Sequence, residues 1–393
     1  MSKFKFGILF LVLGLVFMFS AIFLLNTNKA EAVSTTHVLE NSYLEKYDIS
    51  NIPFDELMTK LDDINKSVSN DSVILNVNGQ YYTYSLNEIG VSLNVESLYK
   101  SIVSNKSSDE QQNVYNFKYK VDNDKVKAFL NDLKTKVDVA PVNGTLEMGE
   151  DHILRYVNET VGFSLNVDKS YDILVKEFSK NAYYPKIDLV GDKVYTDDPL
   201  KPLNTKISSY TTYFDNTVKR KFNLIAAAGY TTGTILYPGE VFSYWQKAGP
   251  YNKPGYVAYM GVKGNGVCQV ATTIYDAELL GGLETVTRYE HPDLVTYSPG
   301  GLDATVSSSP EFIADFKFKN NLSAPIYLSV YVEDNRVVAE IWSYENATNG
   351  LRYEIESVKR AYGSYDAYRH VFNAQGEEVR TDYLGRSHYY KEL

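Results

Sequence analysis

A glycine-rich turn that leads directly into a helical pattern carries the only cysteine of the chain. Residues 264–266 are Gly-Asn-Gly, and Cys268 follows two positions later. Val270, Ile274 and Ala277 then recur at the spacing of an amphipathic helix, which a glycine pair at 281–282 ends. The pattern therefore predicts a helix that begins at the cysteine.

This position favours a reactive thiol. The unpaired N–H groups of a first helical turn and the helix dipole stabilise negative charge, so we expect the pKa of Cys268 to fall. The glycines before it allow a bound carbonyl to approach the backbone, and a nearby N–H is a candidate oxyanion donor. The alternative is an inert buried side chain, which is common for free cysteines. We interpret Cys268 as a candidate nucleophile.

Length and charge limit the classes of protein. A chain of 393 residues predicts two or three domains. The net charge of −10, without a basic cluster, excludes nucleic acid as a partner. No histidine, cysteine or acidic cluster in the N-terminal half has the spacing of metal ligands, and the sequence indicates neither a metal nor a cofactor.

The N-terminus predicts a membrane anchor. Residues 6–25 carry no charge and follow Lys3 and Lys5. A helix of this length spans a bilayer, and the two lysines place its short end in the cytoplasm. The predicted location is the cell membrane, crossed once, with the bulk of the chain on the cell-wall side. The competing interpretation is a cleaved signal peptide, for which residues 30–32 supply a small-x-small site.

An internal repeat follows. Residues 89–95 return as residues 161–167, an offset of 72, and each copy precedes a helical pattern. The repeat predicts two related α+β units. Between them, Asn123 is a candidate cap for a helix with Val126, Leu130 and Leu133 on one face.

The second half predicts a sheet-rich α+β domain. Asn216 is a candidate start of a helix whose Val218, Phe222 and Ile225 share a face. Strand patterns follow at 234–243 around a Pro-Gly turn, and at 305–306, 314–318, 326–332 and 337–342, with a hairpin turn at 334–335. Strands after 346 are expected to complete the sheet.

The predicted fold class is therefore α+β, with an N-terminal transmembrane helix, repeated α+β units, and a sheet-rich α+β domain with C-terminal β-hairpins. The predicted domains are a cytoplasmic tip and anchor at 1–29, a spacer at 30–52, the repeat domain at 53–198, a catalytic domain at 199–345 and a β extension at 346–393.

Both domains resemble known families. Through its repeated glycine, serine and leucine positions, the repeat domain resembles the peptidoglycan-binding domain that often precedes a VanW-like domain. In the second half, successive signature blocks resemble the VanW-like family: 223–227, 237–243, 266–275, Arg288 with His291, and 301–306. The sequence departs from the family at Asn265, usually glycine, and at Ala271, usually serine.

The resemblance implies an L,D-transpeptidase that acts through Cys268 on peptidoglycan. The thiolate attacks the carbonyl of the third residue of a tetrapeptide stem, and an amine of another stem resolves the thioester, which gives a 3-3 cross-link. The implied partners are stem peptides and glycan, and the candidate substrate-binding residues are Gly266, Gln269, Thr272 and Thr273. The alternative is a non-catalytic cell-wall-binding or envelope-tethering protein.

The general base is expected to be His291, because the other four histidines lie outside the predicted catalytic domain. Asp303 or Asp293 is a candidate to orient its ring, and we favour Asp303 because it belongs to a signature block. Arg288 is a candidate partner for a stem-peptide carboxylate, with a salt bridge inside the fold as the alternative.

Overall fold

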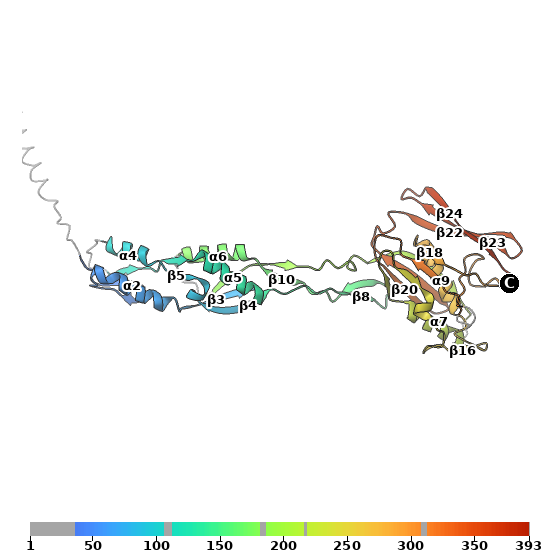
Figure 1. The fold of residues 1–393 in the computed structure, drawn as a ribbon, viewed down its shortest axis with the longest axis horizontal. Helices are drawn as coiled ribbons and strands as arrows, with labels where there is room; N and C mark the ends of the chain where they lie inside the picture. The colour runs from blue at the N-terminus through green and yellow to red at the C-terminus, as the bar shows by residue number, and fades with distance from the viewer. Residues whose placement is uncertain (1–35, 106–111, 181–185, 216–217, 308–312, 393) are drawn as a thin grey trace, which may run out of the picture. The chain divides into compact units, whose positions relative to one another are not determined.

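The computed structural model describes residues 36–105, 112–180, 186–215, 218–307 and 313–392. They form two compact units, shown in Figure 1 from blue to red along the chain. The N-terminal unit contains residues up to 140 together with 162–194. The C-terminal unit contains 141–161 and residues from 195 onward, so a short segment of the predicted repeat domain belongs to it.

The N-terminal unit is built from helices on small sheets. Its sheets have the strand orders β2-β1-β6, β11-β3-β4, β5-β7 and β10-β12. The helices are α2 (Phe54–Val68), α3 (Leu86–Ile89), α4 (Val95–Val103), α5 (Asn123–Val137) and α6 (Val167–Ser179). The strands are β1 (Ser42–Leu44), β2 (Tyr47–Asp48), β3 (Ser72–Val77), β4 (Gln80–Ser85), β5 (Val91–Leu93), β6 (Asn113–Tyr115), β7 (Tyr119–Val121), β10 (Gly162–Leu165), β11 (Lys186–Leu189) and β12 (Gly191–Val194).

The two copies of the internal repeat share a local arrangement. In each copy a short strand leads through an asparagine into a helix: β5 into α4, and β10 into α6. Asn94 accepts a hydrogen bond from the N–H of Ser97 at 3.1 Å, and Asn166 accepts one from Lys169 at 3.0 Å. The repeated asparagine is therefore the helix cap. The cap of α5 is Asp122 and not Asn123, because the Asp122 side chain accepts the N–H of Lys125.

The predicted spacer is partly folded. Val38, Leu44 and Ile49 are buried in the core of the N-terminal unit, and β1 and β2 lie in this segment. The sequence analysis missed these strands because their apolar residues have neither a helical nor a strand period.

The predicted fold class requires one correction, the transmembrane helix. No helix in the described residues is both long enough and apolar enough to cross a bilayer. The longest, α2 and α5, have 15 residues each, or about 22 Å at about 1.5 Å per residue, against a hydrocarbon core of about 30 Å. The predicted span at 6–25 lies outside the described residues.

The C-terminal unit contains two main sheets, the two-stranded pairs β8-β9 and β16-β17, and a C-terminal sheet. A four-stranded antiparallel sheet has the order β13-β21-β20-β14, and a three-stranded sheet has the order β15-β19-β18. The helices are α7 (Val218–Thr231), α8 (Tyr244–Ala248) and α9 (Val267–Leu280). The strands are β8 (Thr145–Met148), β9 (Leu154–Val157), β13 (Thr205–Tyr213), β14 (Thr234–Leu236), β15 (Val241–Ser243), β16 (Ala258–Tyr259), β17 (Val262–Lys263), β18 (Glu284–Thr287), β19 (Lys317–Lys319), β20 (Ile326–Glu333), β21 (Arg336–Ser343), β22 (Arg352–Ala361), β23 (Ser364–Phe372) and β24 (Glu378–His388).

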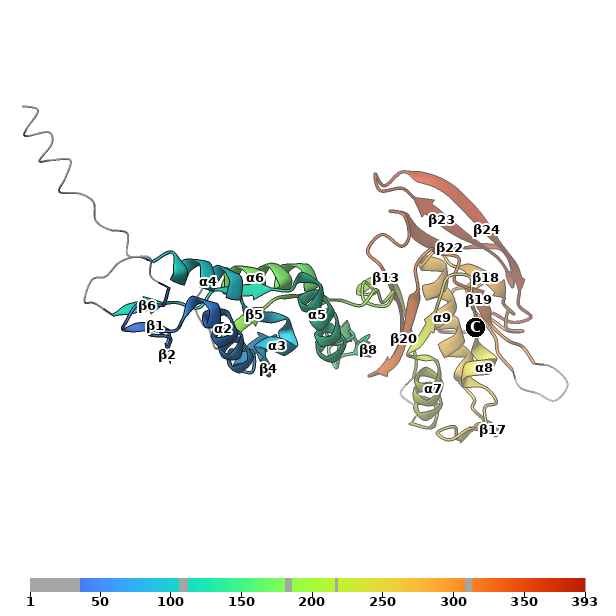
Figure 2. The same cartoon turned by 60° about the vertical axis from the view of Figure 1, so that its left-hand side comes forward.

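Helix α9 lies at the centre of this unit (Figure 2). It begins next to the cysteine and ends before Gly281, as predicted. It packs against β13 and β21 of the four-stranded sheet and also contacts β18 and β22. Every residue from Val267 to Leu279 except Cys268 is buried. The helix is therefore enclosed on all sides and not amphipathic.

The three apolar residues expected to share one face of α7 do not form its core face. Val218, Phe222 and Ile225 are exposed, whereas Leu224 and Ala227 are buried. The helical period was correct, but the small alanines let this side of the helix pack closely against the sheet, so the large apolar side chains point outward. Small residues at a contact allow such close approach.

The strand predictions were partly correct. The hairpin β20–β21 turns at Asp334, which has a φ of 51°, and β14 and β15 flank the Pro-Gly turn. Residues 305–306 form no strand, because their backbone crosses the start of α9 instead. Strands β22, β23 and β24 form an antiparallel sheet of their own and do not complete another sheet.

The two faces of α7 give a stability prediction. Leu224→Ala should lower the free energy of unfolding by about 2–5 kcal/mol, because Leu224 is 0% exposed. Phe222→Ala should lower it by less than about 1 kcal/mol, because Phe222 is 52% exposed. Denaturant unfolding of the purified protein measures both. A larger loss for Phe222→Ala would contradict the observed orientation of the helix.

Candidate active site

The turn before α9 depends on two glycines with positive φ. Gly264 has a φ of 76°, and a Cβ there would lie 2.6 Å from the Cβ of Tyr251. Gly266, the N-cap of α9, has a φ of 109°. Asn265 between them donates a hydrogen bond to the carbonyl of Tyr259 at 3.2 Å, so it is compatible with the turn. The turn places Cys268 as the second residue of α9, where it is partly exposed.

A buried asparagine on α7 holds this turn in place. The side-chain amide of Asn223 donates to the carbonyl oxygens of Val257 at 3.1 Å and Asn265 at 2.9 Å. Its oxygen accepts the N–H of Val257 at 2.8 Å. Asn223 is fully buried, so these three bonds are shielded from water. They fix the start of α9 relative to α7.

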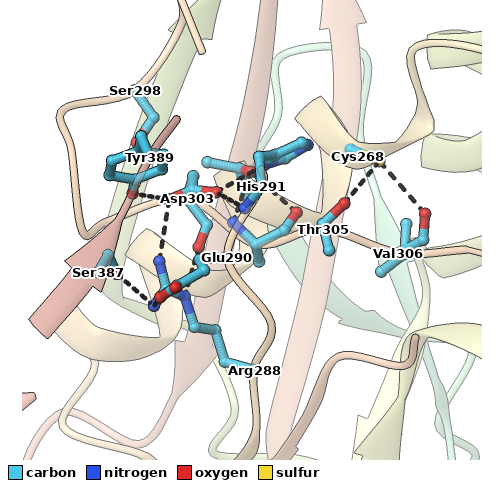
Figure 3. Close-up of polar contacts among 12 residues, drawn as sticks. Cys268, Arg288, Glu290, His291, Ser298, Asp303, Thr305, Val306, Ser387 and Tyr389 are labelled. Carbon is cyan, nitrogen blue, oxygen red and sulfur yellow. Dashed lines mark hydrogen bonds and ion pairs between the residues drawn. The ribbon is translucent and has the colours of Figure 1, made fainter. Parts of the chain in front are cut away.

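The thiol lies against the backbone of residues 305–306 (Figure 3). Cys268 Sγ is 3.3 Å from the carbonyl oxygen of Val306 and 3.7 Å from Thr305 Oγ1. Thr272, one turn further along α9, exchanges hydrogen bonds with the backbone N–H and carbonyl of Ala304, at 3.0 and 3.2 Å. The 303–306 segment is therefore fastened to the helix that carries the thiol.

His291 is oriented by Asp303. The distance from His291 Nδ1 to Asp303 Oδ2 is 2.6 Å, and the backbone N–H of His291 donates to the same oxygen at 2.8 Å. This bond leaves Nε2 on the opposite side of the ring, with the Tyr297 hydroxyl at 3.4 Å. Figure 3 shows the three side chains in the order Asp303, His291, Cys268. Asp293, the other candidate, is exposed to solvent.

Asp303 is held by three further donors. Arg288 donates from Nε to the backbone carbonyl oxygen of Asp303 at 2.6 Å and from Nη2 to Oδ1 of Asp303 at 2.9 Å. The hydroxyl of Tyr389 also donates to Oδ1. Burial opposes the charged form of Asp303, but the hydrogen bond from His291 and the charge of Arg288 lower the pKa of this carboxyl below its usual value. Asp303 therefore remains an anion.

Thiol and imidazole favour each other's charged forms. Burial raises the pKa of Cys268, but the hydrogen bond and charge of His291 outweigh it, and the pKa falls below the ordinary 9.0. Burial opposes the charged imidazole, yet its hydrogen bonds with Asp303 and Cys268 raise the pKa of His291 to about 9. The two groups therefore titrate as a coupled pair, in which each charge stabilises the other.

The structure places the predicted substrate-binding residues in different roles. Gly266 lines a pocket that contains Cys268. Gln269 and Thr273 are fully buried and bonded to each other and to Thr212, and Thr272 holds Ala304. These three side chains position α9 and do not line the pocket.

Arg288 forms a salt bridge inside the fold, which is the second of the two alternatives predicted for it. It is bonded to Asp303, to Ser387 Oγ at 2.9 Å and, as an ion pair, to Glu290 at 3.6 Å. Ala271 is fully buried in the core, so the serine usual in the family would also be buried there.

Sequence analysis missed several residues of the site. Thr305 and Val306 were predicted as a strand. Their place in the signature block 301–306, together with Asp303, was a signal that they belong to the site. Tyr389 gave no local signal, because it lies 86 residues after Asp303 and is brought to it by the C-terminal sheet. Its hydroxyl also accepts the N–H of Gly301 at 2.7 Å.

The comparisons with known proteins agree with this architecture. Residues 219–342 match the family model "VanW like protein", and residues 82–183 match "Putative peptidoglycan binding domain". The uncharacterized protein YoaR of Bacillus subtilis is 30% identical over 253 residues, which cover 59% of this chain and 78% of YoaR. No solved structure matches the chain.

The chain therefore belongs to the VanW-like family, with a peptidoglycan-binding domain ahead of its VanW-like domain. The Vancomycin B-type resistance protein VanW of Enterococcus faecalis is 28% identical over 158 residues, 35% of this chain and 56% of that protein, so the chain spans little more than half of this relative. Cys268, His291 and Asp303 lie in the matched VanW-like segment, and Tyr389 lies beyond it. The domain pair supports a role at the cell wall and peptidoglycan as a partner.

The ion pair gives a prediction for thiol reactivity. In His291→Ala the alkylation of Cys268 by iodoacetamide should shift to higher pH, because only the hydrogen bonds with Val306 and Thr305 then oppose the effect of burial, which raises the pKa of the thiol. Alkylation rate against pH measures this, with melting temperature as the control for folding. Identical profiles in two folded proteins would contradict the pairing.

Two buried acids on α9 give a prediction for stability. Burial, and then the charge of Asp303, raise the pKa of Asp276 well above 3.8, and burial raises the pKa of Glu278 to about 8. Above pH 4 the unfolded chain releases protons that the folded protein keeps, so each acid lowers stability as pH rises, by at most about 1.4 kcal/mol per pH unit.

Asp276→Asn should therefore gain stability relative to the wild type as pH increases from 5 to 9, by at most about 1.4 kcal/mol per pH unit. Glu278→Gln is the matched control, since its gain should level off near pH 8. Denaturant unfolding across this pH range measures both. A gain independent of pH would show that the carboxyl of Asp276 is ionised in the folded protein.

Proposed function

We propose that the C-terminal unit is a cysteine acyltransferase that acts on peptidoglycan stem peptides, as an L,D-transpeptidase. The observation that carries the proposal is the arrangement of Cys268, His291 and Asp303 at the start of a buried helix. A thiol paired with an imidazole, itself oriented by a carboxylate, is the usual constellation for nucleophilic acyl transfer. The peptidoglycan-binding domain supplies the substrate class, and the cell-wall side of the membrane is the proposed place of action.

In the first step the Cys268 thiolate attacks the carbonyl carbon of the third stem residue. Negative charge moves to the carbonyl oxygen, near the backbone N–H of Cys268 in the first turn of α9; the N–H groups of Val267 and Gln269 on either side already donate to the carbonyls of Gly264 and Gly266. The C–N bond to the fourth residue then breaks. The imidazolium of His291 gives its proton to the departing amine, and a thioester remains on Sγ.

In the second step an amine of a neighbouring stem attacks the thioester. Neutral His291 accepts a proton from the attacking nitrogen, the C–S bond breaks, and the thiolate leaves beside the imidazolium that was formed. A new amide joins the two stems, and both residues return to their starting charges. Asp303 keeps its charge throughout and stabilises the imidazolium in each resting stage.

The first prediction concerns the thiol. Cys268→Ala should abolish cross-linked dimers from tetrapeptide muropeptides and change the melting temperature little, because the thiol is partly exposed and its role is chemical. Cys268→Ser should not restore activity, since a hydroxyl ionises far less readily. Product analysis by chromatography and mass spectrometry decides this. Dimers at the wild-type level with Cys268→Ala would leave the non-catalytic cell-wall-binding alternative.

The second prediction concerns pH and the base. Acylation should decline above about pH 9, where the pair loses the proton that the leaving amine requires. His291→Ala should slow acylation by about 10²-fold to 10⁴-fold. Single-turnover rates of thioester formation test both. A rate that keeps rising beyond pH 10 would contradict the role of the imidazolium as the acid.

A further inference from the structure

A pocket of about 420 Å³ opens directly beside the thiol. Its lining includes Cys268 and three valines, Val262, Val267 and Val306. The volume is in the range that holds a small ligand, and the apolar walls suit a side chain as small as a methyl group. The reaction as proposed uses the thiol at the edge of this pocket but does not account for the other polar groups in it.

One of these groups is a cation. Lys263 on β17 lines the pocket and is exposed. Among the described residues no carboxylate forms an ion pair with it, and its Nζ has only the carbonyl oxygen of Asn252 at 3.5 Å. The hairpin that carries it turns at Met260 and Gly261, both with positive φ, and is tied to α7 through Asn223 and Val257. A fixed backbone therefore presents a positive charge without a counter-ion.

The other group is a buried hydroxyl. Tyr251 lines the same pocket and is 7% exposed. Within the described part of the chain its hydroxyl oxygen is buried and has no hydrogen-bond partner. The ring packs edge-on against Trp245 and Tyr256, with centroid distances of 5.8 and 5.9 Å. Burial, and then the charge of Cys268, raise the pKa of Tyr251, so the hydroxyl keeps its proton.

We propose that Lys263 and Tyr251 bind the C-terminal carboxylate of the residue that leaves in the first step. The inference rests on the proposed function. When the scissile carbonyl lies at Sγ, the carboxylate of the next residue lies about 3.8 Å further along the chain, within the pocket. Lys263 supplies the charge, Tyr251 supplies a fixed donor, and the valines contact the methyl group of an alanine. The site selects a donor that ends one residue after the scissile bond, and an internal peptide lacks the group it recognises.

The test compares two donors, a tetrapeptide stem with a free C-terminal carboxylate and the same stem with a C-terminal amide. Thioester formation on Cys268 is followed by mass spectrometry with the acceptor held constant. The wild type should prefer the acid by about tenfold or more. Lys263→Met and Tyr251→Phe should raise KM for the acid. They should leave kcat for the acid, and both kcat and KM for the amide, unchanged, and so remove the preference. Lys253→Met, on a lysine outside the pocket whose Nζ contacts the carbonyl of Lys247, is the matched control and should retain it.

A preference that survives in both pocket variants would overturn the proposal. An equal loss of kcat on both donors with Tyr251→Phe would also overturn it for that residue and would assign the hydroxyl to the oxyanion of the first step.

If the wild type forms no thioester with either donor, the proposed function has failed and the pocket is tested separately. Iodoacetate and iodoacetamide then replace the stems as alkylating agents for Cys268. Lys263→Met, and not Lys253→Met, should lower the iodoacetate to iodoacetamide rate ratio severalfold, and an unchanged ratio would exclude the anion site.

Discussion

The structure of the C-terminal unit depends on the burial of one helix. Because α9 is enclosed on all sides, its polar side chains need partners, and several of these partners connect the helix to the rest of the unit. Asp276 is the exception, since both of its carboxyl oxygens are buried without a hydrogen-bond partner among the described residues. Gln269 binds β13, Thr272 binds the 303–306 segment, and Glu278 accepts from Thr285. The one residue of the first two turns that stays partly exposed is Cys268. A thiol in this position has little freedom to move, as the proposed acyl transfer requires.

The sequence was most informative where a local pattern determines local structure. The Gly-Asn-Gly turn and the helix after it were predicted, because each depends on residues a few positions apart. The repeated asparagines were noted only as part of the repeat, and their role as helix caps came from the structure. The candidates Cys268, His291 and Asp303 were chosen from residue type and signature blocks, and the fold brings them together. Their chemical roles remain predictions.

Long-range packing decided what the sequence analysis missed. On α7 the helical period was correct, but Ala227 and Ala228 face the core and Phe222 is 52% exposed, so the small residues and not the large apolar ones make the close packing contact. Gln269 and Thr273 lie in a block that the family shares, yet their bonds are structural. A shared block reports that a position is constrained, and only the contacts distinguish a substrate contact from a structural one.

The C-terminal sheet shows how far the site extends beyond its motif. Asp303 is a buried anion, and such a charge is costly unless several donors surround it. Two of these donors, Arg288 and His291, come from the matched family segment, and the third, Tyr389, comes from the end of the chain, where Ser387 also binds Arg288. The strands after 346 are therefore part of the electrostatic environment that orients His291. Without the C-terminal strands, the carboxylate of Asp303 would lack the hydroxyl of Tyr389 as a donor.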